Sequence, residues 1–99
     1  MINHITFLRF KENLSESEKR IASVKLKSGF EGLAGKIDGM ANIKVENILL
    51  ETSNVDLIVT AQFETKEALN NYHTSPLAFN FKNTLDESLE KTYIADYIA

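Results

Sequence analysis

The spacing of apolar residues switches between strand-like and helix-like along this chain, and the order of the switches constrains the fold more than any other feature. Residues 2–11 (INHITFLRFK) are rich in β-branched and aromatic residues and carry apolar side chains at both odd and even positions. That pattern is typical of a strand covered on both faces. Apolar runs over 43–51, 55–64 and 92–99 predict three more strands, of which the first two form a hairpin.

Between the first two strands lies a segment with the three- and four-residue apolar spacing of an amphipathic helix. Ser15 to Glu18 (SESE) has the form of a capping box, in which the serine hydroxyl and the glutamate carboxylate bond each other's backbone amide groups. The apolar spacing continues as far as Ile37. It therefore predicts a helix over about 15–37.

A second helical region follows the third strand. Thr65 can cap a short helix over 65–72. Ser75 then offers another cap before Pro76, and proline is well tolerated at the first position of a helix because its missing amide proton has no partner there. This pattern predicts a further helix over about 76–90.

The resulting order, β-α-β-β-α-β, is the split βαβ pattern of a ferredoxin-like α+β fold, with helices covering one face of a four-stranded antiparallel sheet. The 99 residues fit a single domain, 1–99, since domains contain about 100–200 residues. A chain of this size buries only about 60–70% of the surface that its unfolded form exposes. Association with a partner would therefore add to its stability.

The sheet face without helices offers a surface for such a partner. The first strand has apolar side chains on both faces, and the third carries Ile58 on the side opposite its other apolar residues. A monomer rarely exposes an apolar sheet face of several hundred Å². We therefore expect a homodimer that forms through the helix-free sheet face.

Composition excludes several classes of function. The chain has no cysteine, which excludes disulfides, thiolate zinc sites and cysteine nucleophiles. The net charge is −3 and the charges are interspersed, so no basic stripe is available for nucleic acid. The N-terminus lacks the pattern of a signal peptide, and no apolar segment reaches the roughly 20 residues that span a bilayer. We expect a cytoplasmic protein that binds neither nucleic acid nor membrane.

Four short motifs, in order along residues 2–98, make the chain similar to the stress-responsive α/β barrel (Dabb) family. They are His4 within HITFLRFK, the segment FETKEALNNY (63–72), Pro76, and the terminal ADY (95–97). The family includes plant polyketide cyclases of the olivetolic acid type. The resemblance implies a ferredoxin-like chain that dimerises into an α+β barrel.

The chain departs from the cyclase members where those members carry histidines. The family pattern places a tyrosine shortly before His-Pro-x-His, whereas this chain has Ser75 before Pro76 and Ala78 at the last position. A further cyclase histidine, at the start of the third strand, corresponds here to the region of Leu57. The resemblance therefore implies a family member without these cyclase histidines.

His4 and Tyr72 are the candidate catalytic residues. Imidazole exchanges protons near neutral pH, and strand alternation places His4 on the same face as Thr6 and Leu8. Tyr72 could present its hydroxyl to a ligand while its ring packs. Each residue also has a structural interpretation, His4 as a hydrogen-bonded histidine at a barrel rim and Tyr72 as a core or interface aromatic.

Other polar residues are weaker candidates. His73 follows Tyr72 on a helix and points about 100° away from it, so we expect a surface position and no shared site. Asp96 and Tyr97 could fix the last strand or contribute to the dimer contact. A solvated helix face is expected for the acidic residues near the end of the last helix: Asp86, Glu87 and Glu90. We expect no metal and no cofactor, since neither histidine has partners at ligand spacing and the sequence has no glycine-rich phosphate loop.

Three functions are open at this point. The first is binding of a small hydrophobic ligand in a pocket lined by His4, Phe30, Leu33, Tyr72 and Phe81, without an assured reaction. The second is a cofactor-free cyclase, isomerase or monooxygenase-like enzyme, with His4 as acid/base and Tyr72 as orienting donor. The third is a structural or interaction module with a filled core.

Overall fold

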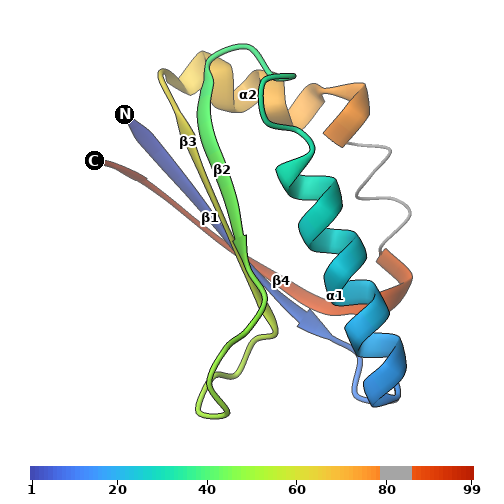
Figure 1. Ribbon diagram of the computed structural model, residues 1–99. Coiled ribbons are helices and arrows are strands. Elements are labelled where there is room, and N and C mark those ends of the chain that lie inside the picture. Colours follow the sequence, from blue (N-terminus) through green and yellow to red (C-terminus); the bar gives the residue numbers. More distant parts are fainter. Residues whose placement is uncertain (79–85) are drawn as a thin grey trace.

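Four strands form one antiparallel sheet in the order β2-β3-β1-β4 (Figure 1). The computed structural model describes residues 1–78 and 86–99. The strands are β1 (Ile2–Phe10), β2 (Met40–Glu46), β3 (Leu57–Phe63) and β4 (Leu89–Ile98). β1 lies between β3 and β4, so the first and last strands of the chain are neighbours. The expected ferredoxin-like α+β sheet is confirmed.

The first helix, α1 (Glu16–Glu31), begins at the predicted capping box. The Ser15 hydroxyl accepts a hydrogen bond from the Glu18 amide, and the Ser15 amide donates to the Glu18 carboxylate, both at 3.1 Å. The prediction that the helix continues to residue 37 is wrong. The helix ends at Glu31, and Gly35 adopts a φ of +77°, which favours glycine and could not continue a right-handed helix to residue 37.

The connection between β2 and β3 corrects another prediction. The two strands form the expected antiparallel hairpin, but β2 ends at Glu46 and not at residue 51. Residues 47–56 form a loop that projects beyond the sheet (Figure 1), with Ile48 91% and Leu50 78% exposed. The apolar run at 48–50 resembles a strand only in composition, because among the described residues the pairing of β2 ends at Glu46.

The second helix, α2 (Lys66–Thr74), begins after Thr65, whose hydroxyl accepts from the Ala68 amide at 3.1 Å. The chain is helical again at Pro76–Ala78, the end of the first described range. The prediction of helix as far as residue 90 is wrong. A 3-10 turn, η1 (Asp86–Ser88), leads into β4, so Glu90 lies on a strand and forms an ion pair with Arg9 at 3.2 Å.

Both helices lie on one side of the sheet (Figure 1). On that side, alternate β3 residues from Leu57 to Phe63 are at most 1% exposed and pack with the apolar faces of α1 and α2. The intervening β3 residues, Ile58, Thr60 and Gln62, are half-buried on the helix-free face. Two of the three are polar, so this face is less apolar than the sequence analysis expected. Within the described residues, no helix is long and apolar enough to cross a membrane.

Candidate functional site

His4 is a buried histidine near the start of the central strand β1. Its side chain is 2% exposed, on the helix-covered face of the sheet. The strand register places it between Ala61 of β3 and Asp96 of β4. Both ends of the chain therefore contribute to the surroundings of this one side chain.

Both ring nitrogens of His4 have polar partners. Nδ1 bonds the Oδ1 atom of Asp96, and Nε2 lies 3.2 Å from the Thr6 hydroxyl. An ionised carboxylate can only accept, so in the neutral imidazole the proton lies on Nδ1 and Nε2 accepts from Thr6. Asp96, His4 and Thr6 thus form a chain of hydrogen bonds, which we call the polar chain. Its outer end is open to solvent, since the Asp96 side chain is 41% exposed.

Three rings surround His4. The centroid of its ring lies 6.4 Å from that of Phe63, 5.8 Å from that of Tyr72 and 5.1 Å from that of His73, each in an edge-to-face arrangement. Phe63 and Tyr72 also contact each other, with centroids 5.4 Å apart. The His4 ring is therefore enclosed by aromatic groups, which lowers the dielectric around it and strengthens its hydrogen bonds.

Tyr72 is almost completely buried, with 1% of its surface exposed. Burial disfavours the phenolate and raises the pKa of Tyr72 to about 12. The hydroxyl is therefore neutral over the physiological range and can donate a hydrogen bond there. This protonation state suits a donor rather than a base.

The position of His73 contradicts the expectation that it shares no site with Tyr72. The side chain is exposed, as expected, but its ring contacts those of both His4 and Tyr72. The two residues diverge around the helix, yet α2 packs against β1 and the His4 ring is within reach of both. Tyr72 and His73 therefore point in different directions from α2 and still contact the same residue, His4.

The other residues of the predicted ligand pocket have different outcomes. Phe30 and Leu33 are buried in the core, at 3% and 5% exposure. Phe81 lies outside the described residues. Ala78 and Leu57, where the resemblance to the cyclases implies histidines in those relatives, are also core residues, at 1% and 0% exposure. The ligand role of this set stays a prediction.

A hollow of about 410 Å³ lies between α2 and the neighbouring ends of β1 and β4. Its apolar lining comes from Ile2, Leu69 and Ile98, and Asp96 reaches it from the polar chain. Lys66 and Asn70 add polar groups from the helix side. We call this hollow the α2 groove.

Sequence reasoning missed the pairing of His4 with Asp96. The signal was present, because a ferredoxin-like sheet places the start of the first strand opposite the end of the last. His4 is the fourth residue of the chain and Asp96 the fourth from its end, and they are direct partners in the register. Within the described residues, no group of three or more acidic or histidine side chains is placed to hold a metal ion.

Fold and site together define a small ferredoxin-like α+β domain with a buried, carboxylate-paired histidine. Residues 2–99 match the Stress responsive A/B Barrel Domain (Dabb) family. The chain belongs to this family. A search of curated proteins gave no match.

Solved structures support the fold. A dimeric ferredoxin-like protein of unknown function from Bacteroides fragilis is 21% identical, with a TM-score of 0.91 over 97% of this chain and 93% of that one. A dimeric ferredoxin-like protein from Thermobifida fusca is 16% identical, with a TM-score of 0.80 over 99% and 90%. A hydroxynitrile lyase from Passiflora edulis is 20% identical, with a TM-score of 0.72 over 99% and 92%.

Proposed function

We propose that this chain binds a small, mainly hydrophobic molecule that carries a hydroxyl group, and that the polar chain recognises that group. The observation that carries the proposal is His4, a buried histidine held by Asp96 and Thr6 within an aromatic enclosure. Ligand sites typically combine apolar walls with a few fixed polar groups. Of the predicted lining, Phe30, Leu33 and Tyr72 belong to the buried core.

The α2 groove supports access to this site from outside. Its volume of about 410 Å³ lies within the range of about 300–1,000 Å³ usual for ligand sites. A ligand in the groove would meet apolar side chains of Leu69 and Ile98 and the carboxylate of Asp96, which is bonded to His4. A hydroxyl group on the ligand would donate to that carboxylate.

A fluorescence titration with 2-naphthol, an aromatic ring system with one hydroxyl, tests this proposal. The wild type should bind the probe, and Leu69→Trp, which fills the groove, should weaken binding at least about tenfold. Leu77→Trp is the matched control, because Leu77 is 51% exposed and does not line the groove. Equal binding by the wild type and Leu69→Trp, or no binding by either, would refute a ligand site in the groove.

A second candidate, acid/base catalysis by His4, is favoured by Asp96. A carboxylate that holds the Nδ1 proton fixes the tautomer of a histidine and stabilises its protonated form, which is how general bases are oriented. In that role Nε2 would exchange its Thr6 partner for a substrate proton, and Tyr72 would orient the substrate as a neutral donor. The reaction would be a cofactor-free proton transfer on a hydroxyl or carbonyl compound.

The two candidates differ in what His4→Gln does. Glutamine keeps one hydrogen bond but cannot accept and release a proton near neutral pH. Under the binding proposal the variant loses stability and binds 2-naphthol more weakly but measurably, because Asp96 still accepts the ligand hydroxyl without the His4 ring that holds it. Under the catalytic alternative it would lose turnover of any substrate found. A structural module would bind nothing in either form.

We also propose that the chain is a homodimer joined through the helix-free sheet face. The dimeric proteins from Bacteroides fragilis and Thermobifida fusca support this assembly. So do Ile5, Phe7 and Ile58, which lie half-buried on that face, and Tyr93 and Tyr97 of β4, which are 46% and 49% exposed. A cytoplasmic location stays a prediction.

A further inference from the structure

β2 is an edge strand, and its free edge is occupied at one residue, Val45. In the order β2-β3-β1-β4, β2 has a neighbour on one side only. In an antiparallel ladder, residues alternate between those whose amide and carbonyl groups face the neighbouring strand and those whose groups face away. Edge residues of the second kind are templates for a strand from another chain.

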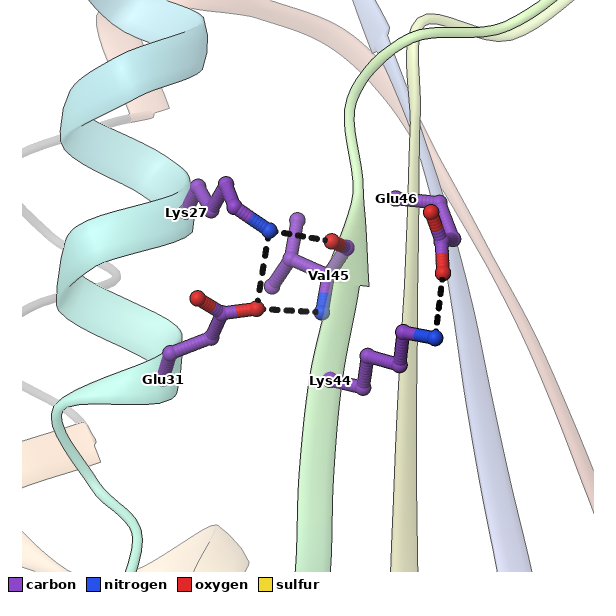
Figure 2. A network of polar contacts seen from close by, with 5 residues as sticks. All are labelled: Lys27, Glu31, Lys44, Val45 and Glu46. Carbon is purple, nitrogen blue, oxygen red and sulfur yellow. Dashed lines mark hydrogen bonds and ion pairs between the residues drawn. The ribbon is translucent and has the colours of Figure 1, made fainter.

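Two side chains of α1 occupy the free edge at Val45 (Figure 2). The Val45 amide donates to Oε2 of Glu31 at 3.1 Å, and the Val45 carbonyl accepts from Nζ of Lys27 at 2.8 Å. Lys27 and Glu31 are also bonded to each other at 3.0 Å. We call this arrangement the edge clamp.

The edge clamp reproduces what a neighbouring strand would offer. A hydrogen-bonded pair in an antiparallel ladder exchanges two bonds, one through the amide and one through the carbonyl of each residue. Glu31 supplies the acceptor and Lys27 the donor to the same residue of β2. An added strand would have to displace both charged groups before it could bond at Val45.

The clamp is built into the sequence of α1. Lys27 and Glu31 are four residues apart and so lie on the same side of the helix. Hydrogen bonds from Lys27 and from the Val45 amide hold the pKa of the Glu31 carboxyl below its ordinary value, so the acceptor is ionised at neutral pH. On the other side of the strand, Lys44 and Glu46 pair at 3.0 Å (Figure 2). Charged side chains thus flank Val45 on both sides, and they disfavour the addition of a strand at this point of the edge.

The opposite edge of the sheet, β4, has no such device. In residues 1–78 and 86–99, no side chain of another element bonds the backbone of β4. Nine of its ten residues are exposed, including Ile94 at 57% and Ile98 at 77%. The sheet is therefore asymmetric, with one guarded edge and one open edge.

We propose that the Lys27–Glu31 clamp closes the β2 edge against a second copy of this chain, so that association is directed to the helix-free face and the β4 side. The clamp prevents the dimer from growing into longer assemblies through sheet extension at β2. This proposal adds to the proposed homodimer, and it rests on the homodimer only for the mass expected of the wild type. It is independent of ligand binding.

The double variant Lys27→Ala/Glu31→Ala tests the clamp. Alanine keeps the helix, and the net charge does not change. Light scattering over a concentration series should give a weight-average mass about twofold or more above that of the wild type at high concentration, because β2 can now accept a strand. Hydrogen exchange of the Val45 amide at low concentration should be faster than in the wild type. The control is Glu16→Ala/Arg20→Ala, an exposed pair with the same spacing on the same helix, which should keep the wild-type mass.

Circular dichroism establishes that each variant is folded. If the double variant unfolds, Lys27→Ala alone frees only the Val45 carbonyl and should raise the mass in the same direction by a smaller factor. A folded clamp variant that keeps the wild-type mass at every concentration, with faster exchange at Val45, would overturn the proposal. The mass of the wild type separately tests the homodimer, so failure of one does not imply failure of the other.

Discussion

The two faces of β3 differ, although their residues alternate along seven positions of the chain. Leu57, Val59, Ala61 and Phe63 face the helices and are at most 1% exposed, whereas Ile58, Thr60 and Gln62 are half-buried on the helix-free face. The first face is covered by the chain itself. The second is covered only in part, which is the condition in which a protein gains most from a partner.

Substitutions on the two faces should therefore affect different properties of the protein. On the covered face a substitution acts on folding, because the surroundings are closely packed and dry. On the helix-free face it acts on association, because the chain can fold with that side chain in water. Polar groups also differ between the two environments. The polar chain at His4 lies on the covered face, whereas most charged pairs lie at the surface of the molecule.

Val59→Asp should have the largest effect, since it places an unpaired carboxylate among the core side chains. We expect a loss of at least about 4 kcal/mol, close to the whole stability of a domain of this size. Circular dichroism would show an unfolded or molten chain at 25 °C. A cooperative thermal transition near that of the wild type would mean that the covered face is not the core.

Tyr72 gives the covered face a dependence on alkaline pH. The unfolded chain ionises its tyrosines near pH 10, while the folded chain keeps the Tyr72 proton to about pH 12. The associated stability is therefore complete below pH 10 and is lost as the pH rises from 10 to 12, by about 2–3 kcal/mol. Urea unfolding at several pH values measures this slope. Tyr72→Phe removes the buried phenol and should flatten the slope.

His4→Gln should destabilise the fold by about 1–3 kcal/mol, because the amide cannot satisfy Asp96 and Thr6 together with the geometry of the ring. Chemical denaturation at pH 8 measures the loss. His73→Gln is the control, with a smaller expected effect because that side chain is exposed. An unchanged midpoint for His4→Gln, accompanied by lost turnover of a substrate, would instead support the catalytic alternative.

Ile58→Asp should have the smallest effect on the chain and a clear effect on its assembly. We expect the stability of the single chain to change by less than about 1 kcal/mol, because Ile58 is half-buried on the helix-free face. Sedimentation should show a shift from dimer to the 11.2 kDa monomer. A wild type that is already monomeric at micromolar concentration would refute the homodimer.

Local patterns allowed most of the fold to be predicted. The capping box at Ser15 and the cap at Thr65 each form as expected, because a cap depends on residues within one turn. The errors concern the ends of elements. Leu33 and Ile37 keep a helical spacing and are buried, yet they lie in the turns after α1, since residues facing the sheet can be supplied by turns as well as by helix.

The site was less predictable because it depends on distant residues. His4 and Tyr72 were chosen for their chemistry, but Asp96 enters only through the register of β1 with β4, and His73 only through the packing of α2 on β1. Neither contact has a signature in local spacing. A sequence shows which side chains can do chemistry, and the topology decides which of them meet.

The bond between His4 and Asp96 joins residues 92 positions apart. During translation at about 5–20 residues per second, His4 therefore waits about 5–20 s for its carboxylate. Until β3 is made β1 lacks both of its neighbouring strands, and from then until β4 is made it lacks one. The central strand of the sheet is therefore the last to be completed, and chaperone contact during synthesis should concentrate on β1. A chain released before β4 is made would lack Asp96 and therefore the site.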